Sequence, residues 1–232
     1  MAQITLYDEA CNFPERSISP NVAKVRFALN FKGLAFKTVF VEFVDLPAIY
    51  EHIQAKPIGA KYTLPVLHDA STGMALANSL DIALYLDAAY PDTRRVVPEG
   101  TEPFHALLTD AFGASVAGPL SAFVFPASFP YLNPAGQRYF LESGRVPEVL
   151  SGDARIAKWA EVKEGLAAFD KYIGAGREWF TGDSISYADF ILAGDLRWAK
   201  VVLEKEEWDE LASWNGGRWG RLVAEIGQFD QL

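Results

Sequence analysis

Two serines stand beside the start of a predicted helix, in the stretch SISPNVAKVRFALNFKG at residues 17–33. Ser19 directly precedes Pro20, and proline suits the first helical position because no amide hydrogen is needed there. A helix N-terminus carries unpaired amide groups and the positive end of the helix dipole, so it attracts anions. The Ser19 hydroxyl can cap its own helix, or it can donate a charge-assisted hydrogen bond to a bound anion.

Three neighbours of Ser19 could share in that chemistry. The amide of Asn21, in the first helical turn, could donate to the same anion or remain in solvent. Ser17 offers a second hydroxyl, but it lies outside the predicted helix and ranks below Ser19. Cys11, the one cysteine of the chain, would act as a nucleophile in a different, disulfide-based chemistry. It stands eight residues before the cap, and the chain has no Cys-x-x-Cys motif, so this interpretation is the weaker one.

The composition of the 232-residue chain is that of an ordinary globular protein: 50% of the residues are hydrophobic, 22% are charged, and the net charge is −9. This charge argues against a general affinity for nucleic acid or anionic membranes. A single cysteine allows no intramolecular disulfide, which fits a reducing, cytoplasmic compartment. The sequence shows no run of about 18 apolar residues, no signal-peptide pattern, and no metal-ligand spacing among its histidines, His52, His68 and His105.

Hydrophobic periodicity predicts a first domain of mixed structure, residues 1–91, in the order β-α-β-α-β-β-α. Its strands are expected at 3–8, 36–43, 63–69 and 74–77, and its helices at 19–32, 45–55 and 78–91. After Pro91 the strand patterns cease, and the polar stretch 91–103 is typical of a linker. An all-helical domain, residues 92–232, is expected to follow, with helices at 104–122, 134–144, 153–174, 186–203 and 216–226.

This organisation resembles the cytosolic glutathione transferases over nearly the whole chain. Three stretches carry the resemblance: SPNVAKVRFALNFKG (19–33), YTLPVLHD with ANSLDIALYL (62–69 and 77–86), and FTGDSISYADFIL (180–192). The first is similar to the start of the first helix in serine-type members. The second is similar to the strand and helix that hold the tripeptide, and the third to a helix start in the second domain. The resemblance implies a thioredoxin-like N-terminal domain followed by a C-terminal helical bundle.

The resemblance also implies roles for the residues at the helix starts, with glutathione as the co-substrate and no metal. Ser19 would donate a hydrogen bond to the glutathione thiolate, with Asn21 and Ser17 as further donors in reach. Leu64 would pair its backbone with the cysteinyl part of glutathione, next to a cis peptide bond at Pro65.

The two ends of glutathione need further partners. The γ-glutamyl end would bind at Asn78 and Ser79, although the family usually has Glu or Asp where this chain has Asn78. Asn78 is also a helix cap in its own right, with Asp81 three residues on as in a capping box. The glycyl carboxylate requires a cation, and the candidates are Lys56, Lys61 and His52.

The second domain contains an apolar, aromatic stretch, AFVFPASFPYL at 122–132, interrupted by two prolines. A core helix is not expected to tolerate that pattern, so we interpret the stretch as a wall of a pocket for an aromatic electrophile. Aromatic packing between helices is the other interpretation. The candidate pocket residues are Phe123, Phe125, Phe129, Tyr131 and Trp198. By contrast, Ser186 and Asp189 form a predicted capping box with a role in folding.

Within the family, the first ninety residues are most like the fungal and bacterial β-etherase-like transferases. That resemblance implies a homodimer that uses glutathione to cleave lignin-type β-aryl ethers. Two other classes of protein remain open: a ligandin that binds glutathione and aromatic compounds with little or no turnover, and a regulatory protein on the same scaffold. The enzyme is the leading interpretation, and the presence of Ser19, Pro65 and Ser79 argues against complete loss of the glutathione site.

Overall fold

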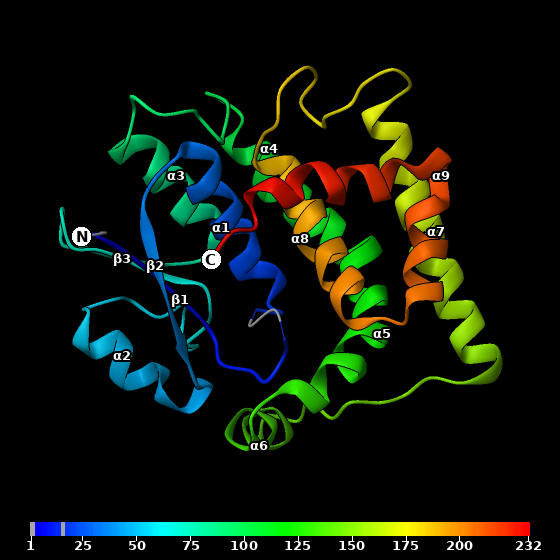
Figure 1. The fold of residues 1–232 in the computed structure, drawn as a ribbon, viewed down its shortest axis with the longest axis horizontal. Helices are drawn as coiled ribbons and strands as arrows, with labels where there is room; N and C mark the ends of the chain where they lie inside the picture. Colours follow the sequence, from blue (N-terminus) through cyan, green and yellow to red (C-terminus); the bar gives the residue numbers. More distant parts are fainter. Residues whose placement is uncertain (1–2, 15–16) are drawn as a thin grey trace. The chain divides into compact units, whose positions relative to one another are not determined.

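The computed structural model of the chain describes residues 3–14 and 17–232, which form two compact units (Figure 1). One, the α/β unit, holds the described residues up to Val96 together with Pro130–Val146 and Phe229–Leu232. The other, the helical unit, holds Val97–Phe129 and Pro147–Gln228. The α/β unit therefore includes two segments that lie far along the sequence from its sheet.

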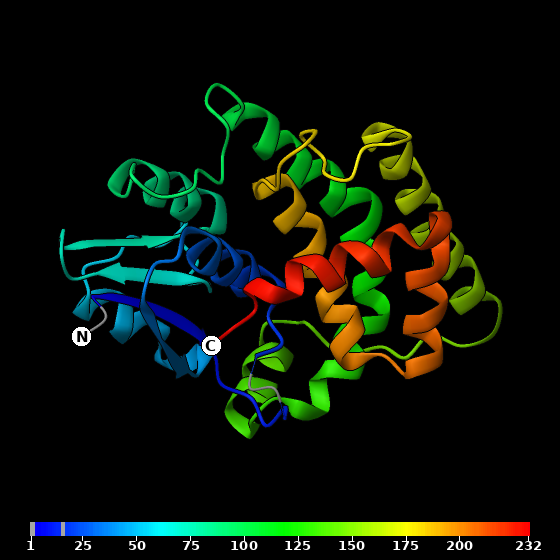
Figure 2. The ribbon, with the colours of Figure 1, turned by 45° about the horizontal axis from the view of Figure 1, so that its top comes forward.

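The α/β unit has the predicted order β-α-β-α-β-β-α. Its main elements are β1 (Ile4–Glu9), α1 (Pro20–Lys32), β2 (Phe36–Val41), α2 (Leu46–His52, preceded by the 3₁₀ turn η1, Phe43–Asp45), β3 (Val66–Asp69), β4 (Met74–Ala77) and α3 (Ser79–Ala89). Helix α6 (Pro134–Glu142) also belongs to this unit. Helices α1 and α3 cover one face of the sheet and α2 lies on the other (Figure 2).

The sheet order is β2-β1-β3-β4. Strand β1 is parallel to β2 and antiparallel to β3, and β3 is antiparallel to β4. It follows that β1 and β4 run in the same direction, and that their carboxyl ends share one edge of the sheet with the start of β3. Val66 pairs with both Tyr7 and Ala77 at this edge.

Helix α1 is bounded by strong local signals. Ser19 caps its start, Pro20 is its first residue, and Gly33 ends it in the left-handed conformation at φ 71°. The helix is buried over most of its length, and a buried ion pair of 2.7 Å between Lys32 and Asp87 joins it to α3.

The C-terminal segment Phe229–Leu232 packs on α1. The Arg26 guanidinium, fully buried, pairs with Asp8 on β1 and lies 3.3 Å from the Asp230 carboxylate. The Asn30 side-chain amide donates to the backbone carbonyls of Phe229 and Gln231, both at 2.8 Å. Residues from the two ends of the sequence thus meet on one helix.

Residues 130–146 pack against η1 and against residues 11–13 of the β1–α1 loop, which joins Glu9 to Pro20. The Asn12 amide donates to the Tyr131 carbonyl at 2.7 Å, and Cys11 forms a β-bridge with Leu132. The rings of Phe13 and Tyr131 meet edge to face at 4.8 Å. Phe43 of η1 stacks on Tyr139 of α6 at 4.9 Å.

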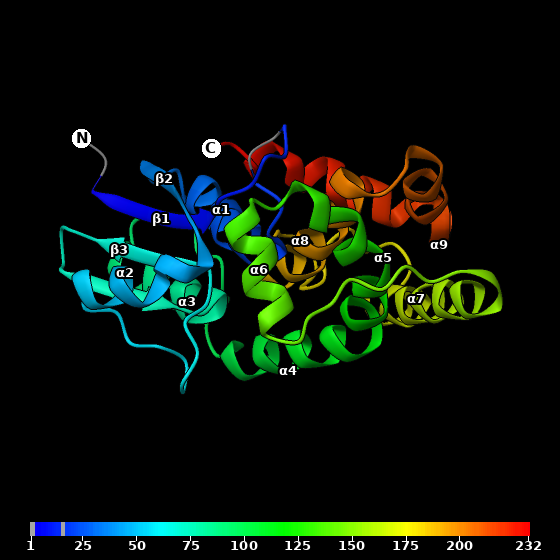
Figure 3. The same ribbon diagram turned by 90° about the horizontal axis from the view of Figure 1, so that it is seen from below.

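The helical unit begins with α4 (Glu102–Phe112), a π-helical turn η2 (Gly113–Ala117) and α5 (Gly118–Ser128), which follow one another without a break (Figure 3). The short 3₁₀ turn η3 (Phe129–Tyr131) comes next. The unit continues with α7 (Gly152–Ile173), α8 (Tyr187–Val202), α9 (Lys205–Ile226) and the 3₁₀ turn η4 (Gly227–Phe229). The predicted capping box of α8 is present, because the Asp189 carboxylate accepts from the Ser186 amide at 2.9 Å.

Two sequence-based expectations about this unit were wrong. Helix α5 continues through Pro126, which lies in its last turn, so the lost amide hydrogen removes one hydrogen bond close to the end of the helix. Helix α9 begins at Lys205, well before the predicted 216, and residues Trp214–Gly217 interrupt it with non-helical backbone.

Because the prolines do not end the helix, the stretch Glu102–Tyr131 is long and apolar enough, by length and composition alone, to cross a membrane. The sequence analysis expected no such run. Within the helical unit, α5 packs against α7 and α8, and the core helix of a soluble protein meets the same criterion.

Candidate functional site

Three candidate segments meet at the carboxyl edge of β1 and β4. The β1–α1 loop leads from this edge to Ser19, Pro65 immediately precedes β3, and Asn78 immediately follows β4. The pairing of Val66 with Ala77 places Pro65 and Asn78 one residue beyond a paired position on neighbouring strands. The fold therefore gathers two helix N-termini and a strand start at one edge of one sheet, an arrangement that binds anions in α/β proteins.

The Ser19 side chain caps α1, as predicted. Its hydroxyl oxygen accepts a hydrogen bond of 3.4 Å from the Val22 amide, and its carbonyl accepts one of 3.1 Å from Ala23. The residue is half-buried. A hydroxyl that accepts in a cap still has its own proton to donate. Capping the helix and donating to an anion are therefore compatible in one side chain.

Asn21 and Lys24 form a polar pair on the first turns of α1. Asn21 is exposed, and its side-chain carbonyl accepts a hydrogen bond of 3.0 Å from the Lys24 ammonium group. Lys24 is only 5% exposed, so it adds a positive charge close to the helix start. Sequence reasoning missed Lys24, although its position three residues after Asn21 places both on one face of the helix.

Ser17 differs from Ser19 because it is fully buried. Its hydroxyl faces the Asp8 carboxyl, which also pairs with Arg26. Burial raises the pKa of Asp8, while the Arg26 guanidinium and the Ser17 hydroxyl act in the opposite direction. Ser17 is thus engaged in the interior of the α/β unit.

The segment before β3 is fixed by Tyr50. The Tyr50 hydroxyl donates to the Thr63 carbonyl at 2.7 Å and accepts from the Thr63 amide at 3.1 Å. Leu64 and Pro65 are both buried, and the peptide bond between them is cis, as predicted.

Asn78 caps α3 with an unusual backbone. Its side-chain carbonyl accepts from the Leu80 amide at 2.9 Å, and its dihedral angles are φ 75° and ψ 122°. Positive φ is costly for a residue other than glycine, and such residues concentrate at functional sites. Ser79, the first residue of α3, is half-buried.

Of the three candidate cations, His52 is the last residue of α2, and Lys56 and Lys61 lie between α2 and β3. Lys56, Lys61 and His52 are all exposed, and over the part of the chain that the structure describes none of them has an ion pair. The backbone of Lys61 exchanges two hydrogen bonds of 3.0 Å with Ile58. Among the residues with described positions, no group of three His, Cys, Asp or Glu is placed to hold a metal ion.

The five aromatic candidates are divided between the two units, and only Phe125 and Phe129 are shown in contact with each other. Tyr131 is 37% exposed and contacts Phe13 in the α/β unit. In the helical unit, Phe125 and Phe129 contact each other at 6.0 Å, and Trp198 on α8 is half-buried.

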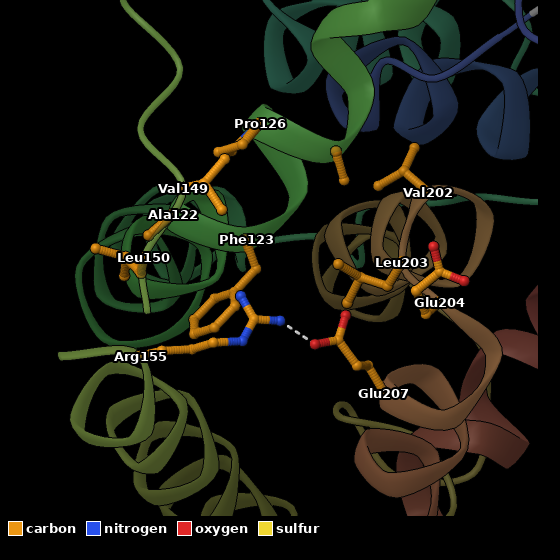
Figure 4. A pocket seen from close by; sticks show the side chains of 11 residues that line it. Ala122, Phe123, Pro126, Val149, Leu150, Arg155, Val202, Leu203, Glu204 and Glu207 are labelled. Atoms are coloured by element: carbon orange, nitrogen blue, oxygen red, sulfur yellow. Dashed lines mark hydrogen bonds and ion pairs between the residues drawn. The ribbon is translucent and has the colours of Figure 1, made fainter. Parts of the chain in front are cut away.

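Phe123 lines a cavity of about 180 Å³ within the helical unit (Figure 4). The Arg155 guanidinium lies over the Phe123 ring, 4.9 Å from its centre, and pairs with Glu207. Other walls come from Val149, Leu150 and the start of α9. This cavity has an apolar floor and an ion pair, and it is built entirely from one unit.

Comparison with protein families gives two matches that together span most of the chain. Residues 14–94 match the model "Glutathione S-transferase, N-terminal domain", and residues 103–229 match "Glutathione S-transferase, C-terminal domain". Among curated proteins, the glutathione S-transferase-like protein ustS of Aspergillus flavus is 27% identical over 89% of this chain and 83% of its own length.

Solved structures from two fungi are similar over the full chain. The glutathione S-transferase CsGST63524 of Ceriporiopsis subvermispora, crystallised with glutathione, is 32% identical with a TM-score of 0.92, covering 99% of this chain and 98% of that one. Glutathione transferase GSTFuA3 of Phanerochaete chrysosporium is 31% identical with a TM-score of 0.91 over the same shares of the two chains. A thioredoxin-like N-terminal domain followed by a helical C-terminal domain is therefore the fold of this chain.

Proposed function

Because the chain belongs to the glutathione S-transferase family, we propose that glutathione binds at the carboxyl edge of β1 and β4 and that Ser19 activates its thiol. The observation that carries this proposal is the meeting of the α1 start, the β3 start and the α3 start at that edge. Two similar fungal structures contain glutathione, which supports the choice of ligand.

Thiol activation needs only a neutral hydroxyl at a helix end. A thiol with a pKa of about 8.5 is roughly 3% ionised at pH 7, and only the thiolate is a good nucleophile. A downward shift of two pKa units makes it mostly thiolate and corresponds to about 2.7 kcal/mol. The Ser19 proton, the α1 N-terminus and the nearby Lys24 charge all favour the anion. In this proposal Asn21 is a secondary donor, and Ser17, buried against Asp8, supports the loop.

The rest of glutathione binds along the same edge. The Leu64 backbone pairs with the cysteinyl part, and the γ-glutamyl carboxylate binds Ser79 and the free amides at the start of α3. Asn78 accepts a hydrogen bond from the ligand's ammonium group, with no charge of its own. Lys56, Lys61 or His52, all exposed, binds the glycyl carboxylate.

Calorimetry should detect glutathione binding at millimolar concentration or below. Ser79→Ala is expected to weaken binding by about 10- to 150-fold, because a hydrogen bond to a charged group contributes about 1.5–3 kcal/mol. Ser213→Ala, which removes an exposed hydroxyl in the helical unit, is the matched control and should bind normally. No heat of binding at several millimolar glutathione would contradict the proposed site.

For the second substrate we propose a bulky aromatic ether. Phe13 and the half-exposed Tyr131 form an aromatic pair beside the loop that carries Ser19, and apolar surfaces select ligands by shape and burial. Phe123, Phe125, Phe129 and Trp198 are proposed as the contribution of the helical domain. A phenol has a pKa of about 10, so phenoxide leaves without a strong general acid.

Turnover of a fluorogenic β-aryl ether should require glutathione and should release the phenol. A chlorinated aromatic serves as the generic transferase substrate in parallel. If glutathione is conjugated to the chlorinated compound while every aryl ether stays intact, the etherase proposal is wrong and the transferase proposal stands. Tight binding of both classes without turnover would favour the ligandin, a reading that the uncharged Asn78 supports.

We further propose that the two domains divide between residues 91 and 92, that the protein is cytoplasmic, and that it forms a homodimer. The homodimer is supported by the exposed apolar side chains of α4, with Leu107 67% and Phe104 38% exposed.

A further inference from the structure

Tyr50 of α2 binds the segment that leads into β3 through its hydroxyl group. The residue is 1% exposed, and its hydroxyl donates to the Thr63 carbonyl at 2.7 Å and accepts from the Thr63 amide at 3.1 Å. A tyrosine hydroxyl has one proton to donate and can also accept, so both of its capacities are used here. One buried side chain thus fixes both backbone polar groups of Thr63.

Residues 56–65 have few other hydrogen bonds. Ile58 and Lys61 exchange two backbone bonds of 3.0 Å within the segment, and the Tyr62 ring meets the Tyr50 ring edge to face at 5.1 Å. In the part of the chain that the structure describes, the two bonds of the Tyr50 hydroxyl are the only hydrogen bonds that join residues 56–65 to another segment. The orientation of the backbone in this segment therefore depends on Tyr50.

Leu64 is the residue whose backbone is proposed to pair with the cysteinyl part of glutathione. It is 8% exposed, and among the described residues neither its amide nor its carbonyl has a hydrogen-bond partner. Backbone groups of buried residues are nearly always paired. An extended ligand beside Leu64 can supply both partners, as a peptide does when it adds a strand to a sheet.

The geometry of one peptide unit connects Tyr50 to this ligand. The Thr63 carbonyl and the Leu64 amide belong to the same planar peptide group, which is trans, so they point in opposite directions. Because the Tyr50 hydroxyl binds the carbonyl on one side, the Leu64 amide is directed to the other side. We propose that Tyr50 is a positioning residue for glutathione, and that its hydroxyl orients the Leu64 backbone for the ligand.

This inference rests on the proposed glutathione site, and it separates binding from thiol activation. Ser19 and Ser79, the proposed partners of the thiol and of the γ-glutamyl carboxylate, stand at the starts of α1 and α3. Neither belongs to residues 56–65. Loss of the Tyr50 hydroxyl should therefore weaken the binding of glutathione and leave the activation of its thiol unchanged.

Tyr50→Phe tests this separation, because it keeps the buried ring and removes only the hydroxyl. The Kd and the KM for glutathione are expected to rise about tenfold or more, the effect of losing one or two hydrogen bonds to the ligand. The kcat at saturating glutathione, and the midpoint of an ultraviolet titration of the bound thiolate, should equal those of the wild type. A rise in KM at constant kcat is the mark of lost binding, and a merely structural role would not produce it.

Tyr85→Phe is the matched control in the same unit. The Tyr85 hydroxyl on α3 donates to the Asp69 carboxylate at 2.8 Å and shares a hydrogen bond of 2.7 Å with the Thr72 hydroxyl. It therefore also has two partners, but they lie at the far end of β3 from Leu64. This variant should lower the denaturation midpoint as Tyr50→Phe does and leave the KM unchanged. An equal rise of KM in both variants would overturn the specific role of Tyr50.

Amide hydrogen exchange measured by NMR tests the contact in the wild type, without any variant and without glutathione. The Thr63 amide, bound to Tyr50, should exchange slowly, whereas the Tyr62 amide, which has no hydrogen bond within the described chain, should exchange fast. In Tyr50→Phe the exchange of the Thr63 amide should be about tenfold faster or more. Equal rates for the two amides in the wild type would overturn the proposal.

The possible failures are distinguishable. If Tyr50→Phe binds glutathione as tightly as the wild type does, the positioning role is wrong and the proposed function stands. If the wild type binds no glutathione, the proposed function is wrong and the positioning role is wrong with it, even where slow exchange of the Thr63 amide shows that Tyr50 holds the segment.

Discussion

Replacing Ser19 by alanine is expected to lower kcat/KM for glutathione conjugation by about 100-fold or more, the usual effect of removing one donor to a developing anion in a closed site. The half-buried hydroxyl caps α1 through its oxygen and keeps its proton for the thiolate. Steady-state turnover, with ultraviolet titration of the bound thiolate, measures the loss and its origin.

Two further variants separate activation from capping. Ser19→Asp preserves the cap, since aspartate is a favoured N-cap residue, but it offers no proton and repels the thiolate. It should therefore unfold like the wild type and be as inactive as Ser19→Ala. Ser17→Ala removes a buried hydroxyl beside Asp8 and should affect turnover less. A larger loss of thiolate in Ser17→Ala than in Ser19→Ala would show that the donor has been misassigned.

The second large effect is expected at Gly165, where α7 crosses the π-helical turn. A side-chain carbon at this position would stand 2.2 Å from the Ser115 carbonyl oxygen and 2.9 Å from Val116 Cγ2. The carbonyl is backbone and cannot rotate away, so Gly165→Ala forces α7 and η2 apart. We expect a loss of about 3 kcal/mol or more in the free energy of unfolding, at the upper end for overpacked cores.

Gly113→Ala is the matched control, because Gly113 lies in the same turn and a side-chain carbon there meets nothing within 4 Å. This substitution should be neutral or stabilise by a few tenths to about 1 kcal/mol, as alanine does in helical backbone. Chemical denaturation monitored by tryptophan fluorescence compares the two. Equal midpoints for Gly165→Ala and wild type would mean that the close approach of α7 is absent in solution.

The sequence predicted elements best where local chemistry sets their ends. Helices α1 and α3 begin within one residue of the predicted positions. Proline, serine and asparagine favour helix starts through contacts with adjacent residues, so the signal does not depend on the rest of the fold. Helix α5 was misjudged because a proline in a last turn has the same sequence signature as a break. The membership of residues 130–146 in the α/β unit depends on pairing between distant segments, which periodicity does not report.

The difference between local and long-range signals also decides which residues of the candidate site could be predicted from the sequence. Ser19 and Asn78 were identifiable as helix caps because a cap acts on its neighbours, whereas Pro65 and the ligand-binding roles came from the resemblance to the glutathione transferases. The positions of Lys24 and Arg26 depend on burial, and a charged residue is ordinarily assigned to the surface. Arg26 pairs with Asp230, which lies 204 positions further along the sequence, and no local pattern indicates such a pairing. The available signal for Arg26 was Asp8, the carboxylate at the end of the predicted strand 3–8.

The contact of α1 with residues 229–232 has a consequence for biosynthesis. Chains emerge from the ribosome in order, and domains generally fold as continuous units soon after they emerge. Here helix α1 lacks Asp230, the second partner of Arg26, and the Phe229 and Gln231 carbonyls that bind Asn30, until about 200 further residues have been translated. The α/β unit must therefore complete its packing after the helical unit has been made.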